Sequence, residues 1–332
     1  MSGDHPDKSR TIARSIRRGH DVHKRIGLIA IAFVALFALA ACGSSTNKTN
    51  HEGDGQTPTG QSTTEQPQQQ EQAPAKLVVG FVPSQEAENL DAKAKPLADL
   101  LTDKLGVPVE VFVGSDYTAL IEAMGAGKVD IGFLNPQGYV LAKDRGYADV
   151  LLKAVRHGSD SYRAQFVVLK DSPIQSIADL KGKKIAFVDP ASTSGYVYPV
   201  VLLKKNGIDP EKDITPIMSG GHDKAILALL RGDADVAVSF DDARTIVEKT
   251  DPDVMNKTRI LTYTDNIPND TVSVRSSLPE AWKEKIKAAF LGIAEDEHGK
   301  QIIQDIYSHD GYTEAKDSDF DVVREANRLM GQ

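Results

Sequence analysis

Short apolar runs alternate with amphipathic stretches from residue 77 to residue 155. The runs have the length of buried strands, and the stretches between them have helical periodicity. The predicted strands are 77–82, 107–113, 129–134 and 149–155, and the predicted helices are 89–105, 117–126 and 137–145. Strands that take turns with helices predict βαβ units and a largely parallel sheet.

A second series with the same alternation follows the extended segment 162–170. Its predicted strands are 184–188, 214–218 and 236–239, and its predicted helices are 195–206 and 223–230. Two more extended segments precede a C-terminal part in which apolar residues recur at helical spacing, namely Trp282, Ile286, Phe290 and Ile293. Two βα sets predict an α/β protein with two lobes, residues 77–163 plus 266–332 and residues 164–265, and a cleft between them.

The loop 189–196 is the strongest candidate for a binding site, and we call it the hydroxyl loop. In open α/β sheets, ligands bind where strands lead into helix N-termini. The loop carries Ser192, Thr193 and Ser194 in succession, followed by Gly195. Hydroxyls and the free N–H groups of a first helical turn suit a phosphate-like oxyanion. The alternative is that one of these hydroxyls only caps the helix.

Residues 1–41 have the pattern of an export signal. Basic residues precede an uninterrupted apolar run, 26–41, that is short for a membrane-spanning helix. The run ends in Leu-Ala-Ala-Cys, which resembles the bacterial lipobox. Because Cys42 is the only cysteine of the chain, we predict that it is lipidated and holds the protein at the outer side of the cell membrane. The alternative is an N-terminal membrane anchor with an incidental cysteine.

The segment that follows Cys42 is almost wholly small and polar up to residue 76, so residues 42–76 are predicted to be a lipidated cysteine with a disordered tether. The chain has a net charge of −8, and seven basic and three acidic residues precede Cys42, which leaves −12 for the remainder. This acidity argues against a nucleic-acid partner. An anion site in such a chain has to use local dipoles.

A family resemblance extends over about residues 77–330. The segment Asp189 to Pro199, D-P-A-S-T-S-G-Y-V-Y-P, closely resembles the signature loop of the phosphonate, phosphite and phosphate substrate-binding family of ABC transporters. Shorter pieces occur in the family's order: Asp116-Tyr117, Gly132 to Pro136, Gly158 to Tyr162, Gly220 to Asp223 and Ile267 to Asp270. The resemblance implies a monomeric binding protein with the type II periplasmic-binding-protein fold. Such a protein would deliver a phosphorus oxyanion from the interlobe cleft to an ABC permease.

The resemblance also implies roles for hydroxyl groups. The three hydroxyls of the hydroxyl loop would hold the phosphoryl oxygens. Tyr117 and Tyr162 would donate phenol hydrogen bonds to the same oxygens, with Tyr139 as the alternative for Tyr162. Without the resemblance, each tyrosine is equally well interpreted as a core residue with a wetted hydroxyl.

Three further residues are implicated in the same way. His222 would donate from a helix start, and Asp242 and Asp270 fall where the family carries acidic residues able to read a ligand amine or a protonated oxygen. Asp241 is the alternative for Asp242. A carboxylate repels a bare dianion, but it favours a ligand that brings an ammonium or retains a proton. The acidic residues therefore favour an aminoalkylphosphonate or a protonated oxyanion over a fully ionised one.

The sequence favours a binding protein over an enzyme on the same scaffold. No cluster of His, Asp and Glu has metal-ligand spacing, no serine lies in a nucleophile-elbow motif, and no cysteine other than Cys42 is present. We therefore expect no catalytic residue, no metal and no cofactor. The remaining alternative is the same fold with another small ligand, such as a sulfonate, a vitamin precursor or a nucleoside.

Overall fold

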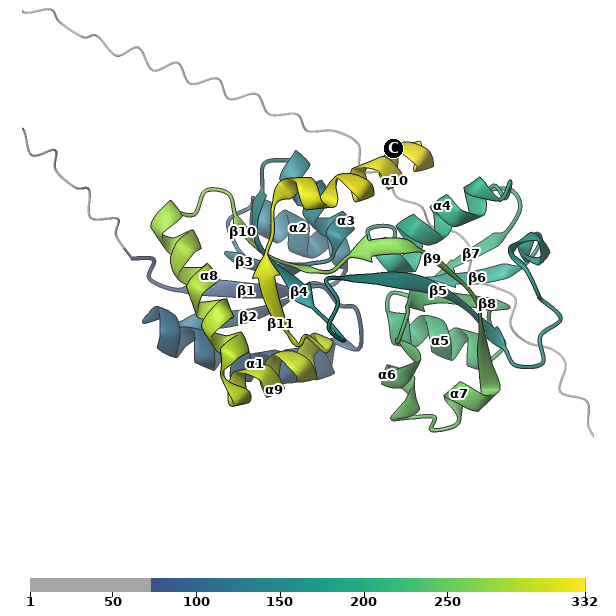
Figure 1. The fold of residues 1–332 in the computed structure, drawn as a ribbon, viewed down its shortest axis with the longest axis horizontal. Coiled ribbons are helices and arrows are strands. Elements are labelled where there is room, and N and C mark those ends of the chain that lie inside the picture. Colours follow the sequence, from purple (N-terminus) through teal and green to yellow (C-terminus); the bar gives the residue numbers. More distant parts are fainter. Residues whose placement is uncertain (1–72, 332) are drawn as a thin grey trace, which may run out of the picture. The chain divides into compact units, whose positions relative to one another are not determined.

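The structure, a computed structural model, describes residues 73–331, so the predicted signal peptide, Cys42 and most of the predicted tether lie outside the described residues. Within them, a six-stranded sheet of order β11-β4-β10-β3-β1-β2 and a five-stranded sheet of order β7-β6-β8-β5-β9 form two lobes (Figure 1). The strands are β1 Leu77–Phe81, β2 Val109–Val113, β3 Ile131–Leu134, β4 Ala148–Val155, β5 Ser161–Leu169, β6 Lys184–Phe187, β7 Thr215–Met218, β8 Val236–Phe240, β9 Thr258–Pro268, β10 Thr271–Arg275 and β11 Gly311–Glu314.

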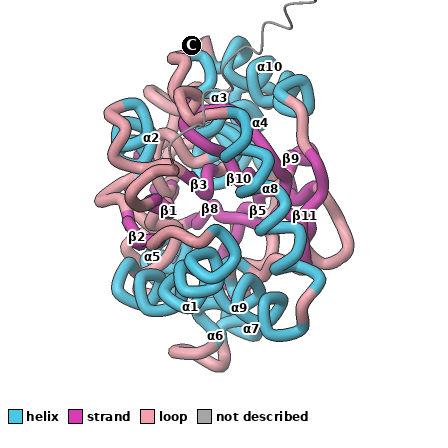
Figure 2. The backbone as a smooth tube through the Cα atoms, turned by 90° about the vertical axis from the view of Figure 1, so that its left-hand side faces the viewer, coloured by secondary structure: helices cyan, strands magenta, loops and turns pink. Residues whose placement is uncertain are grey.

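Helices cover both sides of the strands. They are α1 Ala87–Leu105, α2 Tyr117–Gly125, α3 Pro136–Asp144, α4 Tyr198–Lys205, α5 His222–Leu230, α6 Arg244–Glu248, α7 Val254–Lys257, α8 Glu280–Glu295, α9 Glu297–Tyr307 and α10 Asp321–Met330. Figure 2 shows the strands in the middle, with α3, α4 and α10 on one side and α1, α5, α6, α7 and α9 on the other. The predicted alternation of strands and helices is confirmed for both lobes.

The first lobe is built on three parallel strands. β1 pairs with β2 on one side and with β3 on the other, and its inward side chains Leu77, Val79 and Phe81 are fully buried. The antiparallel strand β10 lies between β3 and β4. The four apolar residues predicted to share one face of α8 are all buried. Burial of such apolar stripes is the main favourable contribution to the stability of the lobe.

Two crossings connect the lobes. β4 leads into β5 through residues 156–160, and β9 leads into β10 through Asn269 and Asp270. Ser161 pairs with Pro268, so β5 and β9 each extend the second sheet three residues beyond the predicted boundaries of 164 and 265. Both crossings therefore lie at the junction of the two lobes, where a cleft is expected.

The C-terminal part differs from the prediction in two respects. It was expected to be helical, but β11 adds an edge strand that pairs antiparallel with β4. α9 ends at Ser308, which has a left-handed φ of 56°, and Tyr312 of β11 then packs its ring edge-on against Phe290. In addition, α10 contacts α3 of the first lobe and α4 of the second, although the sequence assigned it to the first lobe alone.

The hydroxyl loop enters α4 through a π-helical turn, Thr193–Val197. Pro199 lacks the N–H that would donate to the carbonyl of Gly195 in a regular helix, and this carbonyl instead accepts from the N–H of Val188 at 3.0 Å. A Cβ at position 195 would collide with the side chain of Val188. The glycine is therefore required for packing against the end of β6.

Candidate functional site

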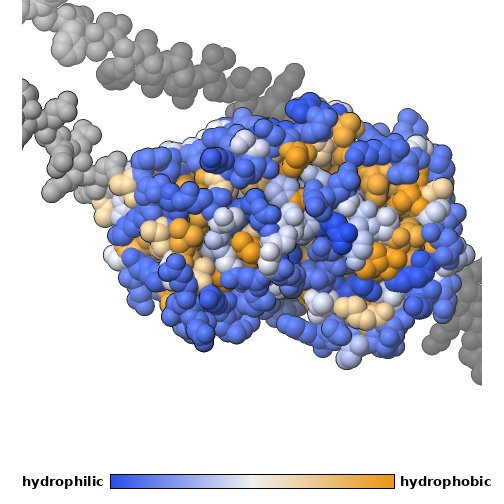
Figure 3. Space-filling model, in the orientation of Figure 1, coloured by the Kyte–Doolittle hydropathy of each residue, from blue (hydrophilic) through white to orange (hydrophobic). Residues whose placement is uncertain are grey.

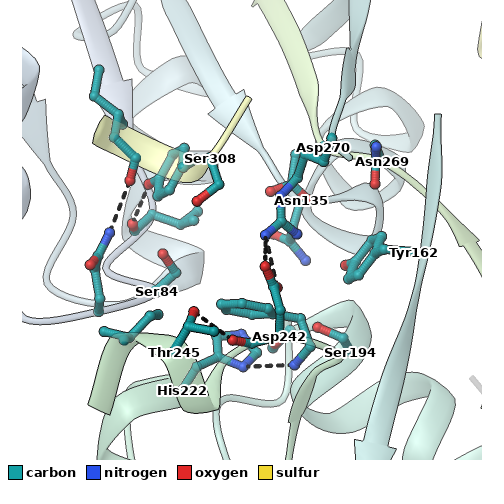
Figure 4. A pocket seen from close by; sticks show the side chains of 18 of the residues that line it. Ser84, Asn135, Tyr162, Ser194, His222, Asp242, Thr245, Asn269, Asp270 and Ser308 are labelled. Carbon is teal, nitrogen blue, oxygen red and sulfur yellow. Dashed lines mark hydrogen bonds and ion pairs between the residues drawn. The ribbon is translucent and has the colours of Figure 1, made fainter. Parts of the chain in front are cut away.

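A cavity of about 440 Å³ lies between the two lobes. Among the residues that line it are seven of the eight predicted ligand-binding residues: Tyr117, Tyr162, Ser192, Ser194, His222, Asp242 and Asp270. They come from α2, β5, the hydroxyl loop, α5, the segment after β8 and the turn between β9 and β10 (Figure 4). Residues that lie up to about 150 positions apart in the sequence thus line one cavity.

Thr193 is the predicted residue that the structure does not place in the cavity. Its fully buried Oγ1 accepts hydrogen bonds from Asn135 Nδ2 at 2.8 Å and from the backbone N–H of Gln137 at 2.9 Å. Asn135 also donates to the carbonyl of Ala191 at 2.8 Å. Thr193 therefore joins the hydroxyl loop of the second lobe to the start of α3 in the first lobe, and this corrects its predicted role as a ligand donor.

The other two hydroxyls of the loop, those of Ser192 and Ser194, line the cavity together with Tyr117 and Tyr162. Burial raises the pKa of both tyrosines well above their usual value, so both phenols remain protonated donors at neutral pH. Ser192 also accepts from the N–H of Gly195 at 3.0 Å. Ser192 therefore caps the helical turn, as the alternative interpretation of the loop predicted, and it lines the cavity as well.

The two alternative assignments lie outside the cavity lining. Tyr139 is fully buried, packs its ring at a tilt against that of Phe320 and donates its hydroxyl hydrogen to Asp317 at 2.8 Å. The carboxylate of Asp241 accepts from the backbone N–H of Arg163 at 3.3 Å. Tyr162 and Asp242, and not these neighbours, face the cavity.

His222 is a buried, neutral imidazole. It begins α5 and is 3% exposed, so its ring is shielded from solvent. Burial lowers its pKa to about 3, which leaves the ring uncharged at neutral pH. The N–H of Phe240 points at Nδ1 at 3.4 Å, and an accepting Nδ1 leaves the proton on Nε2. The backbone N–H of His222 donates to Ser84 in the first lobe at 2.9 Å.

Asp270 has a carboxyl group without a partner among residues 73–331. Burial raises its pKa to about 6, against the opposing effect of the positive charge of Arg156. The turn that carries it is fixed by its neighbour Asn269, which donates to the carbonyls of Ala154 and Ser159 at 3.0 and 2.9 Å. A carboxyl group with this pKa exchanges a proton near neutral pH.

Asp242 is held in an ion pair that the sequence did not reveal. One terminal nitrogen of Arg156 donates to Oδ1 and Oδ2 of Asp242 at 2.9 and 3.1 Å, and His157 Nε2 lies 2.9 Å from Oδ2. Arg156 lines the cavity and directly follows β4. The signal was present, because a cation directly after a predicted strand satisfies the same rule that singled out the hydroxyl loop.

The exposed part of the lining carries two lysines, Lys93 of α1 and Lys249 directly after α6. Burial and the charge of Lys249 lower the pKa of Lys93, so the two ammonium groups influence each other across the cavity. Together with Arg156 they are matched by three carboxyl groups of the same lining, those of Asp242, Asp270 and Asp305. An anion therefore has to be bound by local hydrogen-bond donors and not by a net positive charge.

No group of three or more His, Cys, Asp and Glu residues in the described part of the chain could hold a metal ion. Between residues 73 and 331 there is also no helix that is long and apolar enough to cross a membrane. Hydrophilic residues cover most of the face seen in Figure 3.

The model of one protein family, described as "ABC transporter, phosphonate, periplasmic substrate-binding protein", matches residues 79–320. This chain belongs to that family. The phosphonate substrate-binding family is the one that the hydroxyl loop resembles, so the prediction of the family is confirmed. Its members are substrate-binding components of transporters and act outside the cytoplasm.

Two curated members of the phosphonate substrate-binding family are similar in sequence. The phosphate-import protein PhnD of Mycolicibacterium smegmatis is 36% identical over 188 residues, which are 53% of this chain and 58% of that protein. The phosphonates-binding periplasmic protein of Escherichia coli is 29% identical over 249 residues, which are 73% of each chain.

Solved structures of the family share the fold. A phosphonate-transporter binding protein of Pseudomonas aeruginosa superposes with a TM-score of 0.71 at 24% identity over 76% of this chain and 85% of that one. PhnD1 of Prochlorococcus marinus, solved in complex with methylphosphonate, superposes with a TM-score of 0.71. The two chains are 20% identical, and the match covers 78% of this chain and 99% of that one. The type II periplasmic-binding-protein fold predicted from the sequence is thereby confirmed.

Proposed function

We propose that this chain is a lipid-anchored binding protein that captures a phosphorus oxyanion between its lobes and delivers it to the permease of an ABC importer. The observation that carries the proposal is the convergence of uncharged donors on one cavity. Ser192, Ser194, Tyr117, Tyr162 and His222 come from both lobes and line it together. Closing the lobes around an anion would bring all five into contact with its oxygens.

The chemistry of these groups suits a phosphonate, a phosphite or a phosphate. Such ligands carry one to two negative charges and accept several hydrogen bonds. Hydroxyl groups and a neutral imidazole donate without a charge of their own, and hydrogen bonds to an ionised acceptor are strong where water is excluded. The names of the relatives, which mention phosphate import and phosphonate binding, support the same class of ligand.

The anchor and the tether belong to the same proposal. Lipidation of Cys42 would hold the protein at the membrane, and a flexible segment up to residue 76 would let the folded part reach the permease. A tethered binding protein has a high effective concentration near its membrane partner. The folded part would work as a monomer, since one chain supplies both lobes of the cavity.

A thermal-shift screen tests the ligand. The full-length chain in detergent is heated with phosphate, phosphite, methylphosphonate or 2-aminoethylphosphonate, and with sulfate and methanesulfonate as competing classes. A ligand at one hundred times its Kd stabilises the folded state by about 2.7 kcal/mol, which raises Tm by about 5 to 10 °C. We expect this rise with at least one phosphorus oxyanion.

Matched variants locate the binding site. Ser194→Ala removes a hydroxyl from the cavity and is expected to abolish most of the shift. Ser318→Ala removes an exposed hydroxyl outside the cavity lining and should leave the shift unchanged. A shift with sulfonates alone, or with none of the compounds, would contradict the proposal.

A further inference from the structure

We propose that Arg156 acts as a built-in cation in the position of a ligand ammonium, so that the cavity selects phosphorus oxyanions without an amine. The inference deepens the proposed function and rests on it. Asp242 lies where the family carries an acidic residue able to read an amine, and in this chain it already has a positive partner. Arg156 would then be a specificity-determining residue of the site.

The ion pair uses both oxygens of Asp242. The terminal nitrogen of Arg156 lies 2.9 Å from Oδ1 and 3.1 Å from Oδ2 (dashed lines above Asp242 in Figure 4). His157 adds a contact to Oδ2 at 2.9 Å. The side chain of Arg156 is 12% exposed and that of Asp242 is 27% exposed. Charged hydrogen bonds so shielded from water are strong, and an incoming ligand has to compete with them.

The guanidinium is held in place from a second direction. It lies over the ring of Phe240, with 5.2 Å between its central carbon and the ring centroid, and a cation is attracted to such a face. Arg156 directly follows β4 of the first lobe, whereas Asp242 is the second residue after β8 of the second lobe. The cation is therefore built into the junction of the lobes and lines the cavity from there.

A ligand ammonium meets two obstacles in this cavity. To pair with Asp242 it has to displace Arg156, and near Arg156 it experiences repulsion between like charges. An oxyanion gains from the same arrangement, because Arg156 neutralises a carboxylate that would otherwise repel it. Asp270 offers an ammonium no unopposed site either, since the charge of Arg156 acts on that carboxyl group too.

Titration calorimetry with a matched pair of ligands tests the inference. Ethylphosphonate and 2-aminoethylphosphonate differ by one amino group, and the ratio of their Kd values isolates the effect of that group. We expect the full-length chain in detergent to bind ethylphosphonate at least about tenfold more tightly, a difference typical of a charged hydrogen bond won or lost. In Arg156→Met, Asp242 is free, and the ratio should shift at least about tenfold toward the amine.

Three further variants separate selectivity from structural damage. Arg156→Lys keeps a cation and should keep the wild-type ratio. Arg163→Met removes an exposed arginine that stacks on Tyr263 outside the cavity lining, and it should leave the ratio unchanged. Arg156→Met combined with Asp242→Asn removes both charges of the pair and leaves Asp270 without an opposing cation, so the wild-type preference for ethylphosphonate should be lost. This double variant decides the question if Arg156→Met does not fold.

The outcomes distinguish the inference from the proposed function. If no phosphorus ligand binds to the wild-type chain, the proposed function fails and the inference fails with it. If ligands bind but the wild-type chain prefers the amine, the role assigned to Arg156 is refuted alone. The role assigned to Arg156 is also refuted if Arg156→Met weakens the binding of both ligands by the same factor and leaves the ratio of their Kd values unchanged.

Discussion

Asp242 and Asp270 both line the cavity, and their carboxyl groups differ in their surroundings. On the Asp242 side, burial acts to raise the pKa, but the charge and hydrogen bonds of Arg156 and the contact with His157 outweigh it, so the pKa is lowered. On the Asp270 side, burial prevails and the pKa rises to about 6. The neighbours, and not the residue type, decide whether each pKa lies above or below its usual value.

The difference assigns separate tasks to the two groups. Asp242 remains ionised and is occupied by Arg156. Asp270 has no partner among the described residues and can take up a proton near neutral pH. The sequence treated both as equivalent readers of an amine or a protonated oxygen. In the structure the two are not equivalent, because only Asp242 is hydrogen-bonded to a cation.

Removal of the charge of Asp242 should have the largest effect on stability. Asp242→Asn leaves the shielded guanidinium of Arg156 without its carboxylate, and we expect the free energy of unfolding at pH 7 to fall by about 2 to 3 kcal/mol in urea titrations. Because the folded-state pKa is lowered, the pair contributes stability above the unfolded-state pKa of about 4. The difference between the variant and the wild type should therefore shrink as the pH falls below about 4.

An exposed ion pair provides the matched control. Asp265 pairs with Lys205 at 3.0 Å, but the two side chains are 79% and 50% exposed. Such pairs contribute little, so Asp265→Asn should change the free energy of unfolding by less than about 0.5 kcal/mol. Equal losses from the two variants would mean that the shielding of Asp242 has no energetic importance.

A change at Asp270 is expected to affect the free energy of unfolding in the opposite direction. Asp270→Asn removes a carboxylate that the fold keeps partly from water, and it should raise the free energy of unfolding at pH 7 by about 1 to 2 kcal/mol, a value reduced for partial solvent screening. Below about pH 4, Asp270 is protonated in the folded and unfolded states, so the gain should vanish. A loss of stability at pH 7 would show that the ionised carboxylate is stabilising in place.

Local patterns were sufficient to predict most of the fold. The alternation of strands and helices located every strand of both sheets except β11 and identified the four buried residues of α8. β11 was missed because a four-residue edge strand between two helices has too few positions to show a period of two. The contact of α10 with both lobes could not be predicted, since it depends on how the lobes pack against each other.

The candidate site was predicted less evenly. The hydroxyl loop was recognised from its position after a strand, but the direction of each hydroxyl was not, and Thr193 turned out to bond with Asn135 instead of facing the cavity. Arg156 was missed because its importance comes from Asp242, which is 86 positions away in the sequence. Local patterns locate the loops of a site, but they do not tell which charges meet across a cleft.

The smallest expected effect concerns the coupling of ligand binding to a proton. A bound oxyanion favours the protonated form of Asp270, so affinity should rise as the pH falls toward the pKa of about 6. His222, with a pKa of about 3, and Tyr117 and Tyr162, whose pKa values are raised, keep their protonation states in this range. Between pH 7 and pH 6, the affinity of the wild-type chain for methylphosphonate should rise about three- to fivefold more than that of Asp270→Asn.

Because the ionisation of the ligand is common to both proteins, it cancels in this comparison, and calorimetric titrations at the two pH values measure the remainder. Parallel pH profiles for the wild type and Asp270→Asn would show that Asp270 does not exchange its proton with the ligand, and the contrast with Asp242 would then be confined to stability.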